Sequence, residues 1–267
     1  MNLIWRNIKV LLHPRRYRAE LAEAQRMLRS VTEATNGVVQ RVRELLESDS
    51  WEVRNCAVKI IARTSCTELY DTLVAKLIER DEAGIIRRNC AEMLPVVGLG
   101  TPEAVEALCR ALGDWYWEVR AEAARALALL CDESSELERR LLDALAREAN
   151  MEVRASIAQA LGRVAVSQAG FDTLVALASE GPWLVRHQAA VALLEMGARR
   201  MDFDEAAADV IRRLDLLAEG AATKSVFRQS ILELTDLTAK GRPFPSPESL
   251  RRRYFHLKQG WLRRSAP

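Results

Sequence analysis

The sequence predicts an all-α protein, a right-handed α-solenoid of five clear helical-hairpin repeats plus a degenerate sixth, with extra N- and C-terminal helices. A short motif recurs along the chain at a nearly constant interval, and apolar residues with helical spacing precede each copy. The 267 residues are 49% apolar and include only 12 Gly and 8 Pro. The chain is therefore long enough to bury a sizeable core and too poor in Gly and Pro to be disordered.

Residues 1–36 precede the repeats and are predicted to form amphipathic or capping helices. Apolar residues share one face of the first helix, Arg6 and Lys9 lie opposite, and Pro14 ends it. The residues expected to dock on a membrane surface or a partner are Ile4, Trp5, Ile8, Leu11, Leu12, Arg15, Arg16 and Arg18. Tryptophan and aliphatic side chains opposite cations are typical of an interfacial helix. Alternatively, this helix caps the first repeat, because solenoid ends need covering.

Residues 37–240 contain the repeats, and each copy is marked by a Val-Arg or Ile-Arg pair at the expected start of a second helix. The arginines are separated by 33, 33, 34 and 32 residues; they are Arg54, Arg87, Arg120, Arg154 and Arg186. An acid lies five or six residues before each arginine; these acids are Asp49, Asp81, Asp114, Glu148 and Glu180. Each repeat is thus predicted to be a helix, a short acidic turn and a second helix. Neither helix can bury its apolar stripe alone, so the hairpins must stack.

A weaker sixth repeat is expected around Arg228, and residues 241–267 are expected to form a Pro-rich linker and a basic C-terminal helix. This last helix carries Arg251, Arg252 and Arg253, which suit an acidic lipid head group, a nucleic acid or an acidic protein.

The repeat motif resembles the HEAT-like repeats of bacterial phycobilin-lyase-type and related proteins over about residues 37–198. In that family the turn acid and the helix arginine form a ladder between adjacent repeats. The resemblance implies this structural role for Asp49/Arg54, Asp81/Arg87, Asp114/Arg120, Glu148/Arg154 and Glu180/Arg186. The last two repeats depart from the pattern, since they have Glu where the family has Asp.

Tryptophans occupy the same place in the first, third and fifth repeats. Trp51, Trp117 and Trp183 each precede the motif Val by two residues, and Trp115 and Tyr116 adjoin the middle one. One interpretation is a row of aromatic anchors for a protein partner, because aromatic residues dominate interface energetics. The other is that each Trp packs over its own helical turn. Three adjacent aromatic residues at 115–117 cannot all face inward on one helical stripe.

Charge is divided along the chain. Residues 1–30 carry seven basic and two acidic residues, residues 241–267 carry seven and one, and the remainder carries 25 and 34. An acidic body with two basic ends argues against a long nucleic-acid groove.

Catalytic and metal-binding motifs find little support. The five Cys include no C-x-x-C pair, the three His lie far apart, and no phosphate-binding loop or nucleophile elbow occurs. We therefore expect no metal and no cofactor. The alternative is a nucleic-acid-binding or DNA-glycosylase-like HEAT-repeat enzyme, for which Asp114, Trp115, Trp117 and Trp183 offer the residue types.

The sequence thus predicts a non-enzymatic scaffold or adaptor. Its solenoid surface would bind a protein partner, and its basic amphipathic ends would dock to a membrane surface or a second partner. No apolar run reaches the length of a membrane span, and no secretory signal is present, so we expect a cytoplasmic protein, peripheral at the inner face of a membrane if the ends bind lipid. Nucleic acid is not an expected partner.

Overall fold

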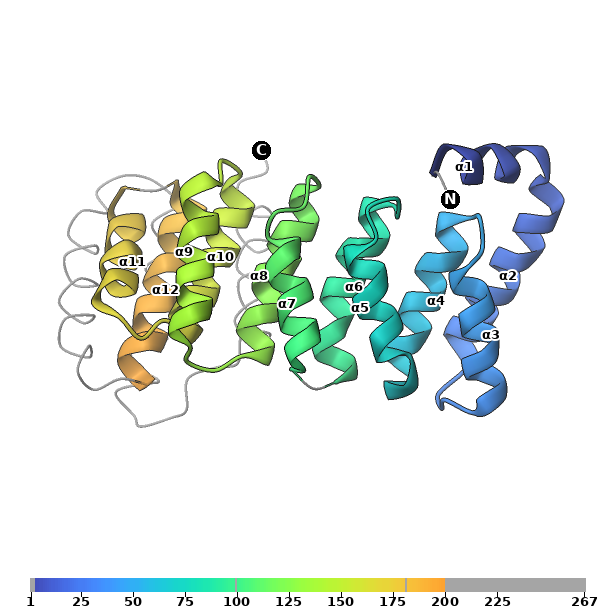
Figure 1. Cartoon of the computed structure of the whole chain (residues 1–267), viewed down its shortest axis with the longest axis horizontal. Helices are drawn as coiled ribbons and strands as arrows, with labels where there is room; N and C mark the ends of the chain where they lie inside the picture. The colour runs from blue at the N-terminus through green and yellow to red at the C-terminus, as the bar shows by residue number, and fades with distance from the viewer. Residues whose placement is uncertain (1–2, 99, 181, 200–267) are drawn as a thin grey trace, which may run out of the picture. The chain divides into compact units, whose positions relative to one another are not determined.

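The protein is described from a computed structural model, which defines residues 3–98, 100–180 and 182–199. Within these ranges every regular element is helical (Figure 1). The chain divides into two compact units, residues 1–130 and residues 131–267, and each is described by itself. The weak sixth repeat and the segment 241–267 lie outside the described residues.

The first unit contains three helical hairpins preceded by two further helices. The hairpins are α3 (Asn36–Leu46) with α4 (Trp51–Arg63), α5 (Tyr70–Ile78) with α6 (Gly84–Val97), and α7 (Pro102–Ala111) with α8 (Trp117–Leu130). A short 3₁₀ helix, η1 (Thr67–Leu69), leads into α5. The second helices pack in series, α4 on α6 and α6 on α8 (Figure 1). The preceding helices are α1 (Leu3–Leu12) and α2 (Pro14–Ser30), and α2 packs on α4 as α4 packs on α6.

The second unit contains two more hairpins in its described part. They are α9 (Ser135–Arg147) with α10 (Met151–Val164), and α11 (Gln168–Glu180) with α12 (Trp183–Arg199). Again the second helices pack on each other, α10 on α12. The five hairpins coincide with the five clear repeats, so the prediction of an all-α solenoid of helical hairpins is confirmed.

The second helix of each repeat begins two residues before the Val or Ile of the motif, not at the motif itself. In two repeats a side-chain cap accounts for this earlier start: Ser50 accepts a hydrogen bond from the amide of Val53, and Asn150 accepts from the amides of Glu152 and Val153. Each repeat arginine is therefore the fourth residue of its helix. Trp51, Trp117 and Trp183 are each the first residue of the helix that contains them.

Small residues along the second helices bring neighbouring repeats close together. Cys90, Ala91, Ala123, Ala124 and Ala158 are fully buried. The closest approach involves Gly162 of α10, where an added Cβ would lie 2.5 Å from the Cβ and 2.6 Å from the Cα of Ala192 in α12. This position requires a glycine because the backbone of the next repeat occupies the space of a side chain.

We predict that Gly162→Ala lowers the free energy of unfolding by about 1–3 kcal/mol, because it overpacks the contact between α10 and α12. The matched control is Gly37→Ala in α3, where no atom lies within 4 Å of the added Cβ. That change should be neutral or stabilise by up to about 1 kcal/mol through helix propensity. Denaturant unfolding of both variants measures the difference, and a stabilising effect of Gly162→Ala would contradict this account.

A second prediction concerns His187, which is 2% exposed in α12. Burial lowers the pKa of His187 from 6.5 to about 4. The unfolded chain therefore takes up a proton at higher pH than the folded chain does, so stability is complete above the unfolded pKa and is lost as pH falls towards 4.

Between pH 7 and pH 4 this single group should remove about 3 kcal/mol of stability. His187→Met removes the titrating group. The difference in denaturant midpoint between the wild type and this variant should therefore narrow or reverse on acidification. Parallel pH profiles for the two proteins would show that His187 does not carry this dependence.

Candidate functional site

The acidic turns and the first turns of the second helices lie together along one edge of the first unit. Successive repeats touch there through charged side chains. The central group is Glu82, whose side chain is completely buried. Arg54 donates from Nε and Nη2 to both carboxylate oxygens of Glu82 at 2.7–3.1 Å, and the amide of Ala83 donates to Oε1 at 2.7 Å.

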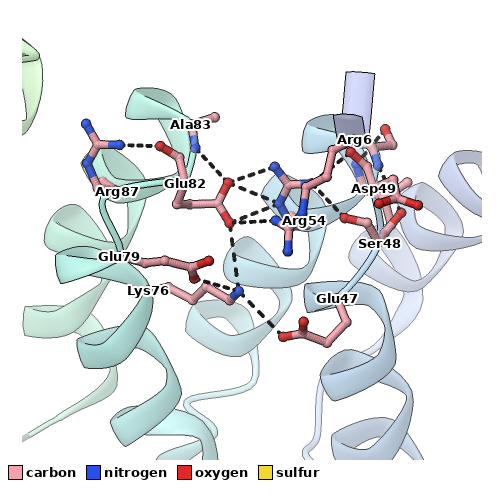
Figure 2. A network of polar contacts seen from close by, with 12 residues as sticks. Arg6, Glu47, Ser48, Asp49, Arg54, Lys76, Glu79, Glu82, Ala83 and Arg87 are labelled. Carbon is pink, nitrogen blue, oxygen red and sulfur yellow. Dashed lines mark hydrogen bonds and ion pairs between the residues drawn. The ribbon is translucent and has the colours of Figure 1, made fainter. Parts of the chain in front are cut away.

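Two further cations face the same carboxylate (Figure 2). Arg6 Nη1 of α1 lies 3.6 Å from Glu82 Oε2, and Lys76 Nζ of α5 lies 3.9 Å from it. Lys76 also pairs with Glu79 at 2.9 Å. Burial raises the pKa of Glu79, but the hydrogen bond and charge of Lys76, with the charges of Arg6 and Arg54, outweigh burial and leave this pKa below its ordinary value. Cations from three helices thus converge on one buried acid.

The acid of this turn was predicted to be Asp81, and the structure corrects that assignment. Asp81 is exposed, whereas its neighbour Glu82 is 1% exposed and holds Arg54. The longer Glu side chain reaches back to the preceding repeat from one position later in the turn. The pairing partner of Arg54 is therefore the turn acid of the following repeat, while Arg54 Nη1 donates to the carbonyls of Ser48 and Asp49 in its own turn.

The next link has the same form. Arg87 donates from Nε and Nη2 to the two carboxylate oxygens of Asp114 at 2.7 and 2.8 Å. It also donates from Nη1 to the carbonyl of Glu82 in its own turn. Two parallel hydrogen bonds fix both the distance and the orientation of the pair. Arg54 and Arg87 therefore each join their own turn to the turn of the next repeat.

A preceding link involves Tyr17, a residue that the sequence did not single out. Tyr17 is the fourth residue of α2, the position that arginine takes in the later second helices, and its hydroxyl donates to Asp49 Oδ2 at 2.8 Å. Burial and the hydrogen bond to Asp49 raise the pKa of Tyr17. A tyrosine thus begins the series of inter-repeat contacts, and the position within the helix was the signal that could have found it.

The remaining repeat arginines bind main-chain carbonyls of their own hairpins. Arg120 donates to the carbonyls of Asp114 and Trp115, Arg154 to those of Leu145 and Glu148, and Arg186 to that of Ala178. Glu148 accepts from the amide of Asn150 at 2.7 Å, and Glu180 is exposed at the end of α11. In these repeats the contacts that the structure describes serve to close the turn.

The aromatic residues of the third hairpin take different environments. Trp115 is 75% exposed, and its ring lies over the guanidinium of Arg87 at 5.4 Å. Tyr116 is half-buried against Gly84, where a Cβ would lie 2.6 Å from the tyrosine ring. This contact explains why the second repeat has glycine where Trp51 and Trp117 stand in their repeats. Trp51 and Trp117 are 41% and 38% exposed. The side chain of Trp183 lies outside the described atoms.

A hollow of about 570 Å³ opens beside Trp115 in the first unit. Its lining includes the apolar Leu77 and Ile78 at the end of α5, and Ile78 is 43% exposed. The charged residues that line it are Arg80, Arg87, Arg110 and Asp114. Arg87 and Asp114 neutralise each other, so the two remaining charged residues of the lining, Arg80 and Arg110, are both basic, and Arg110 pairs with Glu106 of its own helix. Its size is in the range of pockets that hold a small molecule or a few side chains.

The predicted docking residues of the N-terminal segment are exposed. Ile4, Trp5, Leu11 and Leu12 are 62–78% exposed and Ile8 is 36% exposed, while Arg15, Arg16 and Arg18 are exposed at the start of α2. The apolar face of α1 is thus not used to cover the first repeat, and the cap is α2, which buries Tyr17 and Ala24. Arg251, Arg252 and Arg253 lie outside the described residues.

The described residues offer little for metal or thiol chemistry. In residues 3–98, 100–180 and 182–199, no three His, Cys, Asp or Glu are grouped so that they could hold a metal ion. Cys56, Cys66 and Cys90 are buried, and burial raises the pKa of Cys56 and Cys90. A buried thiol with a raised pKa is a poor nucleophile, and these residues serve as small core side chains.

Comparison with known proteins supports the repeat assignment. A family model described as HEAT repeats matches residues 71–137. This segment contains Glu82, Arg87, Asp114 and Trp115, so it covers the Arg87–Asp114 pair and the residues that line the hollow, while Arg6 and Arg54 precede it. A comparison with curated proteins gives no match. The narrower resemblance to phycobilin-lyase-type repeats stays a prediction.

As for membrane insertion, none of the helices in the described part of the chain combines the length and the apolar character that crossing a bilayer requires.

We predict that Glu82→Gln lowers the free energy of unfolding by about 3–5 kcal/mol, because it removes the buried charge that Arg6, Arg54 and Lys76 surround. The matched control is Asp81→Asn, which removes the same charge from the exposed neighbouring residue and should change stability by no more than about 0.5 kcal/mol. Thermal and denaturant unfolding of the two single variants measure both effects. Equal effects of the two substitutions would return the structural role to Asp81.

Proposed function

We propose that the protein is a non-enzymatic scaffold or adaptor. It holds a protein partner at the Trp115 hollow of the first unit and attaches through its basic amphipathic ends to a membrane surface or a second partner. HEAT-repeat solenoids offer extended surfaces of stacked hairpins to their partners, and the family match spans the hollow. Because folds of this type host many roles, the proposal rests on the site itself.

The observation that carries the proposal is the position of Trp115. Its ring is three-quarters exposed, yet it stacks on Arg87. Two hydrogen bonds to the carboxylate of Asp114 hold the Arg87 guanidinium in place. A partner that covers this ring therefore gains a large apolar contact without having to order the side chain first. Tryptophan is among the residues most often found at binding hot spots, and this one is exposed and held in place beside a hollow.

The lining of the hollow indicates the chemistry of the partner. Leu77 and Ile78 supply an apolar wall, while Arg80 and Arg110 supply positive charge at the rim. Arg110 is 65% exposed and pairs with Glu106, so it can exchange this acid for one of the partner. The hollow fits a peptide segment in which a bulky apolar side chain lies next to an acidic one.

The glycosylase-like alternative is less well supported by the same geometry. Asp114 lies beside Trp115, but both oxygens of its carboxylate accept hydrogen bonds from Arg87. A carboxylate held in this way serves as a structural ion-pair partner and is poorly suited to activate a water molecule. The acidic composition of residues 31–240 also disfavours a nucleic-acid groove. We therefore propose a scaffold over a nucleic-acid enzyme, cytoplasmic and, where its basic ends bind lipid, peripheral at the inner face of a membrane.

The proposal predicts that Trp115→Ala weakens partner binding by about 2 kcal/mol or more. Partners are recovered by affinity capture with the full-length protein and identified by mass spectrometry, and a displayed peptide library then defines the bound segment. The melting temperature should change little, because the ring is mostly exposed and its stacking on Arg87 contributes only about 0.5–1 kcal/mol.

Leu129→Ala provides the matched control, because it removes another exposed apolar side chain, 48% exposed, from the same unit. It should leave partner binding unchanged. A library that selects basic peptides, or a partner held equally well by Trp115→Ala, would overturn the assignment of the hollow.

A further inference from the structure

The helix α1 is attached to the first unit by its charged side, which is the reverse of an ordinary surface helix. Arg6 is 4% exposed and faces Glu82, and Lys9 Nζ lies 3.6 Å from Asp49 Oδ1. Arg6 and Lys9 are three residues apart and so share one side of the helix. Amphipathic helices normally turn their apolar side to the core. Here two ion pairs hold the apolar side away from it.

The outward side carries five large apolar side chains within ten residues. These are Ile4, Trp5, Ile8, Leu11 and Leu12, and four of them are more than 60% exposed. Their spacing places them on one continuous stripe along a helix about 15 Å long. An exposed apolar stripe of this kind on a folded protein marks a site where another protein or a membrane binds.

The charges around the stripe indicate what covers it. Residues 1–19 contain five Arg or Lys and no Asp or Glu. Arg6 and Lys9 are engaged with Glu82 and Asp49, while Arg15, Arg16 and Arg18 are exposed directly after α1. Tryptophan and aliphatic side chains beside exposed arginines suit the boundary between anionic head groups and acyl chains. Each cation close to an anionic bilayer strengthens binding about fivefold.

We propose that the outward face of α1 binds the surface of an anionic lipid bilayer, with Arg15, Arg16 and Arg18 against the head groups. The ion pairs of Arg6 and Lys9 orient this face before the membrane is met. This inference deepens the proposed function, on which it rests, by naming the bilayer as the second attachment. Because α1 is already helical and oriented, binding does not require the segment to fold on the membrane.

The test is co-sedimentation of the full-length protein with phosphatidylcholine vesicles that contain or lack phosphatidylserine. The expected result is binding that depends on phosphatidylserine and falls at least tenfold in the double variant Trp5→Ser/Leu11→Ser. The matched control is Val96→Ser/Leu129→Ser, which removes two other exposed apolar side chains of the first unit and should bind as the wild type does. Arg15→Glu/Arg18→Glu should abolish the preference for phosphatidylserine.

Failure of the wild-type protein to bind phosphatidylserine vesicles would overturn the inference, as would unchanged vesicle binding by Trp5→Ser/Leu11→Ser. A self-association or a captured protein that disappears in this variant, without vesicle binding, would assign the face to a protein instead. Capture of the partner at the hollow is measured in parallel with Trp115→Ala. If the wild-type protein does not bind phosphatidylserine vesicles while its capture of the partner still depends on Trp115, the membrane attachment alone is refuted. If it binds the vesicles while capture does not depend on Trp115, the hollow alone is refuted.

Discussion

The carboxylate of Glu82 is buried from solvent and surrounded by Arg54, Arg6 and Lys76, which come from three different helices. A charge in this environment is stable only while its partners are in place, because removing any one leaves the others desolvated and unbalanced. The pair between Glu82 and Arg54 therefore fixes how the second repeat sits on the first. Hydrophobic contact between α4 and α6 is not directional, whereas an ion pair with defined geometry sets one register.

The same set of contacts connects the two surfaces to which we assign binding. The carboxylate of Glu82 pairs with Arg6 of α1, and its carbonyl accepts a hydrogen bond from Arg87. Arg87 in turn pairs with Asp114 and lies under the ring of Trp115. A continuous line of contacts thus runs from the N-terminal helix to the hollow within the first unit, and Figure 2 shows its part from Arg6 to Arg87. Both surfaces are therefore positioned by the stacking of the repeats and require no dedicated loop.

The repeat architecture could be predicted almost completely from the sequence. A nearly constant interval of 32–34 residues between the motifs, together with helical apolar spacing, is compatible with few folds other than a helical solenoid. The sequence did not distinguish Glu82 from Asp81, since the two acids are adjacent and only the backbone of the turn decides which one points inward. Tyr17 was missed because it lacks the charge of the arginines whose position it shares. The orientation of α1 was also beyond the sequence, since the same amphipathic pattern is compatible with either side facing the protein. Trp115 was singled out from its place beside the repeat tryptophan Trp117, but its support by Arg87 is a contact between residues 28 apart, which the sequence pattern does not contain.

The neutral tyrosine at the start of the series has a consequence for assembly. An open solenoid end presents the apolar side of its last hairpin, and identical molecules could then stack end to end without limit. Here α2 covers the side of α4 that a preceding repeat would occupy, and the Tyr17 hydroxyl donates to Oδ2 of Asp49 without introducing another buried charge. The outer residues of α2 include exposed Arg18, Arg26 and Arg29, which would repel the same helix of a second molecule. The first hairpin is therefore covered by a helix with a basic outer surface, which disfavours end-to-end stacking of identical molecules there even though the neighbouring α1 exposes apolar side chains.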